Sequence, residues 1–206
     1  MFEGSCWWIT GASSGIGEAL ARALAQHGTN VILSGRNAAA LEAVAADCKD
    51  ALVLPFEATD FDRIPAIVER AWAWKGRVDG LVNNAGVTQR SLAIDTAFAV
   101  YQKMIAIDLL APIALTQALL PRMLEAGAGR IVAISSVAGI AGVPMRSAYC
   151  AAKHGLPRSL ACFTISGMRT GGICVISTPG TTVTDCALLR ISATLIILVM
   201  IKSIFD

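Results

Sequence analysis

The chain has 206 residues, of which 55% are hydrophobic and 16% are charged, and its formal net charge is +2. This composition excludes intrinsically disordered, collagen-like and coiled-coil proteins, and so small a charge gives no support to nucleic-acid binding. The length suits a single domain, residues 1–206, with a substantial buried core.

Short apolar segments alternate with helical segments along the chain. The expected strands are residues 6–9, 30–34, 51–55, 80–82, 130–134 and 173–177. The expected helices are residues 18–27, 37–48, 60–75, 95–126 and 148–166. Asn37 is a suitable N-cap, and Pro112 marks a break or a kink. The alternation predicts βαβ units around a buried parallel sheet, and therefore a doubly wound α/β domain with three layers.

The cysteine and charge patterns bear on metal binding, on location and on the charge of a ligand. The six cysteines form no C-x-x-C pair and there are only two histidines, so we expect no metal site. A chemistry-bearing motif begins by Thr10, so we expect no secretory signal, a cytoplasmic location and reduced thiols. No acidic residue stands between Glu125 and Asp185. That stretch is either a buried or subunit-facing half of the molecule, or a site for an anionic ligand.

A glycine-rich turn, residues 10–17 (TGASSGIG), joins the first expected strand to the first helix. Gly11 allows a tight turn, Gly15 lets a phosphate approach closely, and Gly17 lets helix and strand pack together. Backbone N–H groups and the positive helix end would then bind a pyrophosphate. The turn lacks the Gly-Lys-Ser/Thr of a P-loop, so it predicts a dinucleotide site, with a purely structural turn as the alternative.

The end of the second strand bears on the choice between NADP(H) and NAD(H). An acidic residue at this point would bind the ribose 2′-hydroxyl of NAD, whereas an arginine accommodates the 2′-phosphate of NADP. The chain has Arg36 there and no carboxylate at the strand tip. We therefore expect NADP(H) to be preferred over NAD(H), with a solvated surface arginine as the alternative.

Tyr149 and Lys153 stand four residues apart on an expected helix, so they share one face. The lysine charge can lower the pKa of the phenol and make it a general acid/base for a carbonyl or alcohol. Such pairs also occur on solvated helix faces. Ser135 and Ser136 end the fifth strand, where open α/β sheets place their ligands, and this favours the catalytic interpretation.

These motifs resemble the classical short-chain dehydrogenase/reductase family, which has the Rossmann fold. The matching segments follow the family's order and spacing from Cys6 to Thr184, within a family-like core of residues 5–184. They are residues 10–17, 83–86 (NNAG), Ser136, 149–153 (YCAAK), Pro179-Gly180 and Thr184.

The resemblance implies a role for each catalytic residue. Tyr149 donates a proton to the substrate carbonyl oxygen while hydride passes from nicotinamide C4 to the carbonyl carbon. Lys153 lowers the pKa of Tyr149 and hydrogen-bonds the nicotinamide ribose, and Ser136 orients and polarises the carbonyl. The chain is then an NADP-dependent oxidoreductase that interconverts a small-molecule carbonyl compound and an alcohol. The alternative is a catalytically impaired member that keeps cofactor binding or a subunit-assembly role.

The resemblance also implies the cofactor contacts. The phosphate side would meet Gly11, Ser13, Ser14, Gly15, Ile16 and Gly17. The 2′-phosphate would meet Arg36 and Asn37, and the adenine would meet Glu57, where the family usually has Asp, and Ala58. The rest of the cofactor would meet Asn84, Ala85, Gly86, Tyr149, Lys153, Pro179, Gly180 and Thr184.

Asp108 stands where the family has its fourth catalytic residue, an asparagine that helps hold a water linking Lys153 to solvent. Asparagine both donates and accepts hydrogen bonds, whereas an ionised aspartate only accepts. Asp108 could bind the same water, pair with Lys153, or be protonated through burial. We expect reduced or pH-shifted activity rather than none.

Two of the expected helices bear on the assembly of several copies of the chain. Family members commonly form homodimers or homotetramers through the helix after Tyr149 and the helix that contains Asp108. Residues 160–165 are apolar enough for such an interface, or for packing on the chain's own sheet.

Residues 185–206 form an atypical apolar tail, so we expect no seventh strand and a short substrate lid. This tail is a buried strand or helix, a membrane anchor with snorkelling cations, or the product of a truncated or altered reading frame.

The substrate pocket is expected around residues 87–93, residues 138–146 and the region after Thr184. Within it, Arg90 and Arg146 are either contacts for an anionic substrate or exposed arginines.

Overall fold

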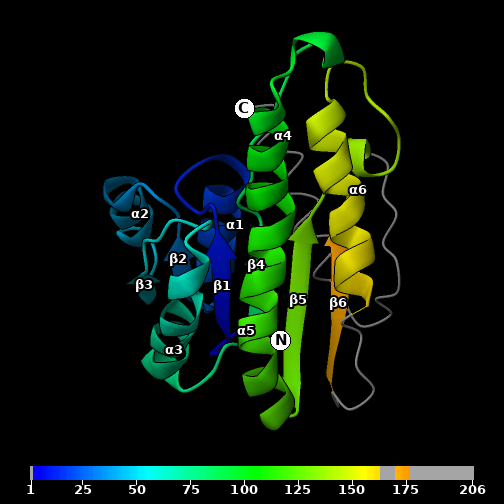
Figure 1. Cartoon of the computed structure of the whole chain (residues 1–206). Coiled ribbons are helices and arrows are strands. Elements are labelled where there is room, and N and C mark those ends of the chain that lie inside the picture. Colours follow the sequence, from blue (N-terminus) through cyan, green and yellow to red (C-terminus); the bar gives the residue numbers. More distant parts are fainter. Residues whose placement is uncertain (1, 163–169, 177–206) are drawn as a thin grey trace.

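Six parallel strands form the central layer of the computed structural model, which describes residues 2–162 and 170–176 (Figure 1). The strands are β1 (Cys6–Thr10), β2 (Asn30–Ser34), β3 (Ala51–Val53), β4 (Gly80–Asn83), β5 (Ala128–Ile134) and β6 (Thr170–Ile176). Their order in the sheet is β3-β2-β1-β4-β5-β6, and each neighbouring pair is parallel. The order reverses between β1 and β4, the point at which such sheets bind their ligands.

Helices cover both faces of this sheet (Figure 1). The helices are α1 (Gly15–Gln26), α2 (Ala38–Ala45), α3 (Ile64–Lys75), α4 (Phe98–Ile105), α5 (Ala111–Glu125) and α6 (Ser147–Ala161). Successive strand residues point to opposite faces. Trp7 therefore joins a core cluster with α1 and α2, while Trp8 joins a second cluster with α3 and α5. Burial on both faces explains why the strands are nearly continuous apolar runs.

A third core cluster, formed by Ala133, Leu156 and Leu160, places α6 on the same side of the sheet as α3 and α5. Leu156 and Leu160 of α6 pack on Ala133 of β5, with Leu109 beside them. Ala133 stands between Val132 and Ile134, which both belong to the α1 and α2 side. The structure therefore has the three αβα layers that the sequence predicts, and α6 lies next to the carboxyl end of β5 (Figure 1).

A π-helical turn, Ala106–Leu110, joins α4 to α5 within one continuous helical segment. Pro112 lies in the first turn of α5, so it has no N–H to donate to the carbonyl of Asp108 four residues earlier. The helix therefore does not break at Pro112; the predicted break or kink takes the form of a π-helical turn just before it. Turns of this kind often occur at functional sites, and this one places Asp108 in the interior with 0% exposure.

The continuous helical segment Phe98–Glu125 is long and apolar enough, by length and composition alone, to cross a membrane. Its residues Leu115, Leu119 and Met123 are buried against the sheet in the second core cluster. Packing inside the domain therefore accounts for much of the apolar composition of this segment.

Most differences from the predicted elements lie at their ends. α1 starts at Gly15 rather than residue 18, because the glycine-rich turn itself forms its first turn. β3 ends at Val53 because Pro55 follows, and α4 begins at Phe98 rather than residue 95. The predicted residues Pro179, Gly180 and Thr184, part of the stretch 160–165 and the apolar tail lie outside the described residues.

Candidate active site

A cavity of about 350 Å³ opens at the carboxyl ends of β1, β2 and β4. Ten of the residues predicted to bind the cofactor line it: Gly11, Ser13, Ser14, Ile16, Arg36, Glu57, Ala58, Asn84, Ala85 and Gly86. Further lining residues are Thr10, Ser34, Gly35, Phe56, Val87 and Ile107, which the sequence did not indicate as cofactor contacts. The cavity thus brings together segments from the first, second and fourth strands at the switch point of the sheet.

The glycine-rich turn has the backbone that its sequence requires. Gly11 and Gly15 have φ of +67° and +56°, a region that residues with a Cβ rarely adopt. A Cβ on Gly15 would meet nothing within 4 Å, so this position is open to an approaching ligand. Ser14 is the N-cap of α1, but its side chain makes no capping hydrogen bond. The helix N-terminus is therefore a suitable place for a phosphate.

Gly17 is required for packing, as predicted. A Cβ at this position would lie 2.2 Å from the backbone oxygen of Gly11 and 2.5 Å from Nδ2 of Asn84. We expect Gly17→Ala to lower the free energy of unfolding by about 1–3 kcal/mol, because the turn must shift, and to weaken NADPH binding. Thermal denaturation and fluorescence titration measure both effects. Gly142→Ala is the matched control, since a Cβ there meets nothing within 4 Å. Unchanged stability and affinity in Gly17→Ala would contradict this account.

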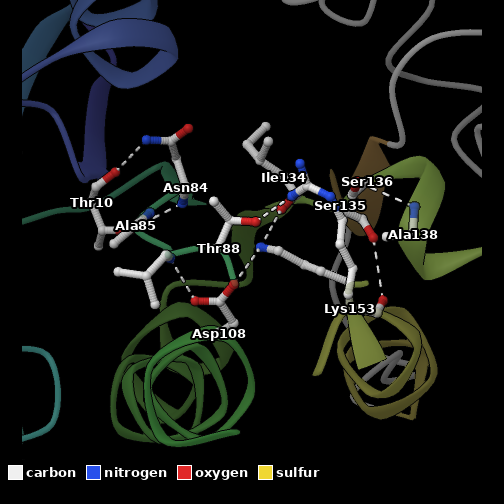
Figure 2. A network of polar contacts seen from close by, with 12 residues as sticks. Thr10, Asn84, Ala85, Thr88, Asp108, Ile134, Ser135, Ser136, Ala138 and Lys153 are labelled. Atoms are coloured by element: carbon white, nitrogen blue, oxygen red, sulfur yellow. Dashed lines mark hydrogen bonds and ion pairs between the residues drawn. The ribbon is translucent and has the colours of Figure 1, made fainter. Parts of the chain in front are cut away.

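Thr10 and Asn84 connect β1 to the end of β4 (Figure 2). The Thr10 hydroxyl donates to the carbonyl of Val82 at 3.2 Å and accepts from the backbone N–H groups of Asn84 and Ala85, both at 3.0 Å. The Asn84 amide donates to the carbonyls of Thr10 and Gly11 at 2.9 and 3.3 Å. These bonds hold the floor of the cavity rigid. The role of Thr10 was missed, because only the fold shows that its hydroxyl meets β4.

Lys153 and Asp108 form a buried ion pair beside this floor (Figure 2). Lys153 Nζ lies 3.6 Å from Asp108 Oδ2 and donates to the carbonyl of Ile134 at 3.3 Å. Asp108 Oδ1 accepts the backbone N–H of Val87 at 2.8 Å. Pairing with Lys153 is one of the alternatives that the sequence left open for Asp108. Asp108 Oδ2 is buried without a hydrogen-bond partner in the described part of the chain, so it can still accept one.

Burial acts on both members of this pair. It raises the pKa of Asp108, while the Lys153 charge and the Val87 N–H lower it. Burial lowers the pKa of Lys153, while Asp108 raises it. In each case burial favours the neutral form and the partner favours the charged form. The charge of Lys153 is therefore locally balanced by Asp108.

Tyr149 is half-buried, and the Lys153 Nζ lies 5.7 Å from the centroid of its ring. Burial raises the pKa of the phenol; a hydrogen bond from Ser136 and the charge of Arg146 lower it, and the Asp108 carboxylate raises it. The sequence predicted that Lys153 lowers this pKa, but the net direction in the structure is upward. The physical reason is that Tyr149 is withdrawn from water while Asp108 offsets the ammonium charge.

The two serines after β5 have different partners. The Ser135 hydroxyl is buried and donates to the carbonyl of Lys153 at 3.3 Å, so it fixes α6 to the sheet. The Ser136 oxygen accepts the N–H of Ala138 at 3.2 Å and caps the short turn Val137–Gly139. Ser136, close enough to hydrogen-bond Tyr149, is left with a hydroxyl proton to donate. The structure thus brings together all four predicted catalytic residues.

Five predicted cofactor residues in the described part of the chain do not line the cavity: Gly15, Gly17, Asn37, Tyr149 and Lys153. Asn37 is the N-cap of α2, as predicted, and its side chain accepts the N–H of Ala40 at 3.1 Å. Gly86 lies over the ion pair: a Cβ there would be 3.3 Å from both carboxylate oxygens of Asp108 and 3.4 Å from Lys153 Nζ. A larger residue at this position would therefore crowd the ion pair.

Comparison with known proteins shows where else this arrangement occurs. The family model described as short chain dehydrogenase matches residues 6–189. Human dehydrogenase/reductase SDR family member 7 is 44% identical over 157 residues, which cover 72% of this chain and 46% of that protein. The ketoacyl reductase HetN of Nostoc sp. is 39% identical over 152 residues, which cover 72% of this chain and 53% of that protein. The chain thus spans about half the length of these curated relatives.

Solved structures agree with the sequence relatives. A metagenomic short-chain oxidoreductase in complex with NADP is 30% identical with a TM-score of 0.82, over 98% of this chain and 91% of that one. A short-chain dehydrogenase from Streptomyces avermitilis is 35% identical with a TM-score of 0.80, over 88% of this chain and 67% of that one. The family match covers most of the sequence and includes the glycine-rich turn and the residues around Lys153, so the chain belongs to the short chain dehydrogenase family.

Proposed function

We propose that the chain is an NADP(H)-dependent oxidoreductase that interconverts a carbonyl compound and an alcohol. The observation that carries this proposal is the cluster of Ser136, Tyr149 and Lys153, in which Lys153 lies next to Gly86 of the cavity lining. Support also comes from the relatives named as reductases and from the related structure in complex with NADP.

The cavity fits a dinucleotide in its chemistry. The helix N-terminus at Gly15 suits the pyrophosphate, Gly86 leaves space beside the buried Lys153, and Arg36 follows the carboxyl end of the second strand. The nicotinamide, when bound, supplies or accepts the hydride. Asn84 and Thr10 keep the cavity floor fixed through the hydrogen bonds that join β1 to β4.

The protein's own residues handle the proton and the orientation of the substrate. In reduction, the Tyr149 hydroxyl donates its proton to the carbonyl oxygen; in oxidation, the tyrosinate accepts the proton from the alcohol. Ser136 donates a hydrogen bond to the same substrate oxygen and so fixes it next to the phenol. The ion pair of Lys153 with Asp108 sets the electrostatic environment of the Tyr149 phenol, and the carbonyl of Ile134 holds the Lys153 ammonium in place.

Arg36 carries the proposed preference for NADP(H). Its only carboxylate partner in the described residues is Glu57 at 3.9 Å, with 69% and 45% of the two side chains exposed. Such a surface pair contributes little, so a 2′-phosphate can replace it. We expect Arg36→Ala to weaken NADPH binding roughly 10- to 100-fold and to leave NADH binding nearly unchanged, because a charge-assisted hydrogen bond contributes about 1.5–3 kcal/mol.

Fluorescence titration with NADPH and NADH measures this preference. Arg63→Ala is a matched control, because Arg63 is similarly exposed and has a similar 3.8 Å contact with Asp60, but lies outside the cavity. Tighter binding of NADH than of NADPH by the unmodified protein would contradict the assignment of Arg36.

A second function is favoured by the ion pair of Asp108 with Lys153, which ties up the lysine. In this case the chain binds the cofactor without turnover and serves in assembly with further copies through α5 and α6. A panel of aldehydes and ketones, followed at the absorbance of NADPH, decides between the two. Oxidation of NADPH that depends on a carbonyl compound supports the reductase, whereas tight NADPH binding without turnover supports the second function.

A further inference from the structure

The guanidinium of Arg146 lies beside the proposed general acid. Its Cζ is 5.8 Å from the centroid of the Tyr149 ring, one turn further along the chain. Arg146 is the N-cap residue of α6 and is half-buried. Its position at the start of the helix therefore brings a second cation, besides Lys153, to the place where the substrate must bind.

The two cations differ in their partners. Lys153 is paired with Asp108, so its charge is largely balanced. No carboxylate of the described residues lies within 4 Å of Arg146. No acidic residue stands between Glu125 and Asp185 in the sequence. Within the described residues, Arg146 thus has no carboxylate to balance its charge next to Tyr149, and a half-buried charge of this kind favours an anionic ligand.

A hydrogen bond holds the guanidinium in place. Arg146 Nη1 donates to the hydroxyl of Thr88, on the loop that follows β4. Residues 88 and 146 come from two of the regions that were expected to shape the substrate pocket. Because Thr88 takes only one of five N–H donors, the others remain for a ligand. An arginine fixed on one side in this way is preorganised to bind a carboxylate in bidentate fashion.

We propose that Arg146 binds a carboxylate of the substrate, so that the preferred substrates are oxo acids and the corresponding hydroxy acids. This inference rests on the proposed function, since it assigns the substrate class of the same site. The carbonyl that Tyr149 protonates and the carboxylate that Arg146 binds would lie a few bonds apart. A monoanionic carboxylate matches a single guanidinium, whereas a phosphate carries about −1.5 to −2 and would leave excess negative charge.

Matched pairs of substrates test this assignment. The pairs are benzoylformate with its methyl ester, and 4-oxopentanoate with its methyl ester, each reduced by the unmodified chain, Arg146→Gln, Arg146→Lys and Arg158→Gln. The measured quantity is the ratio of kcat/KM for the acid to that for the ester. Loss of the Arg146 charge also affects Tyr149, but this affects acid and ester alike and cancels in the ratio.

We expect the ratio to fall roughly 10- to 100-fold in Arg146→Gln, because an ionic hydrogen bond to the carboxylate is lost. Arg146→Lys should retain part of the ratio, since it keeps the charge and loses the planar fork. Arg158→Gln should leave it unchanged, because Arg158 is an exposed cation further along α6 and outside the cavity lining. An unchanged ratio in Arg146→Gln, or no preference of the unmodified chain for either acid over its ester, would overturn the assignment.

A binding measurement separates this inference from the proposed function. Mandelate and methyl mandelate, the reduced forms of the first pair, are titrated calorimetrically into the chain saturated with NADPH. Binding of mandelate that weakens tenfold or more in Arg146→Gln supports the carboxylate site even if no carbonyl compound is turned over. Equal affinities for mandelate in the unmodified chain and Arg146→Gln, or no binding of mandelate to either, overturn it whether or not the chain is a reductase.

Discussion

Tyr149→Phe is expected to lower kcat/KM for carbonyl reduction about 10²- to 10⁴-fold, the usual contribution of a positioned general acid. The change removes the hydroxyl that donates the proton and leaves the ring that contacts Arg146 and Lys153. NADPH affinity and the thermal midpoint should therefore change little. The rate of NADPH oxidation with an active carbonyl compound, measured beside NADPH titration, gives both quantities.

Tyr101→Phe is the matched control for this substitution, because Tyr101 is the chain's other tyrosine. Its hydroxyl shares a 2.7 Å hydrogen bond with the Ser147 hydroxyl and lies in α4, away from the cavity lining. Its loss should cost little activity. If both variants kept their activity, the proton would come from another donor, and the proposed mechanism would be wrong.

The sheet and the cofactor loop were predictable because their signals are local. A strand buried on both faces must be apolar along its whole length, so β1, β2 and β5 stand out in the sequence. The positive φ of Gly11 and Gly15 is likewise a property of the glycines themselves. Element ends were less predictable, because they depend on single hydrogen bonds and on contacts with neighbouring elements.

The parts that were missed depend on residues distant in the sequence. Thr10 acquires its role only when β4 lies beside β1, and Thr88 meets Arg146 across 58 positions. The same holds for the direction of the pKa shift of Tyr149, which depends on burial and on the charge of Asp108 as well as on the nearby lysine. Spacing along one helix could indicate that Tyr149 and Lys153 act together, but it could not show what surrounds them.

Asp108→Ala is expected to lower the free energy of unfolding by about 3–5 kcal/mol, because it leaves the Lys153 ammonium buried without a counter-charge. Lys153 is 5% exposed and Asp108 is 0% exposed, so water cannot take the place of the carboxylate. The N–H of Val87 also loses its acceptor. Urea denaturation measures the loss. Asp47→Ala, which breaks an ion pair with Arg22 at the surface, should cost under about 1 kcal/mol and is the control.

Asp108→Asn removes the charge and keeps an oxygen that can accept the Val87 N–H, so its loss of stability should be less than half that of Asp108→Ala. The Asp108 carboxylate raises the pKa of Tyr149, so its removal should lower that pKa. Alcohol oxidation needs the tyrosinate as base, and its rate rises with pH through this pKa. The rising limb should therefore lie at lower pH in Asp108→Asn than in the unmodified chain. Identical pH–rate profiles would show that Asp108 does not act on Tyr149 through its charge. A shifted rising limb together with a small change in stability would show that the charge of Asp108 acts on the pKa of Tyr149, while its hydrogen bond to the Val87 N–H acts on stability.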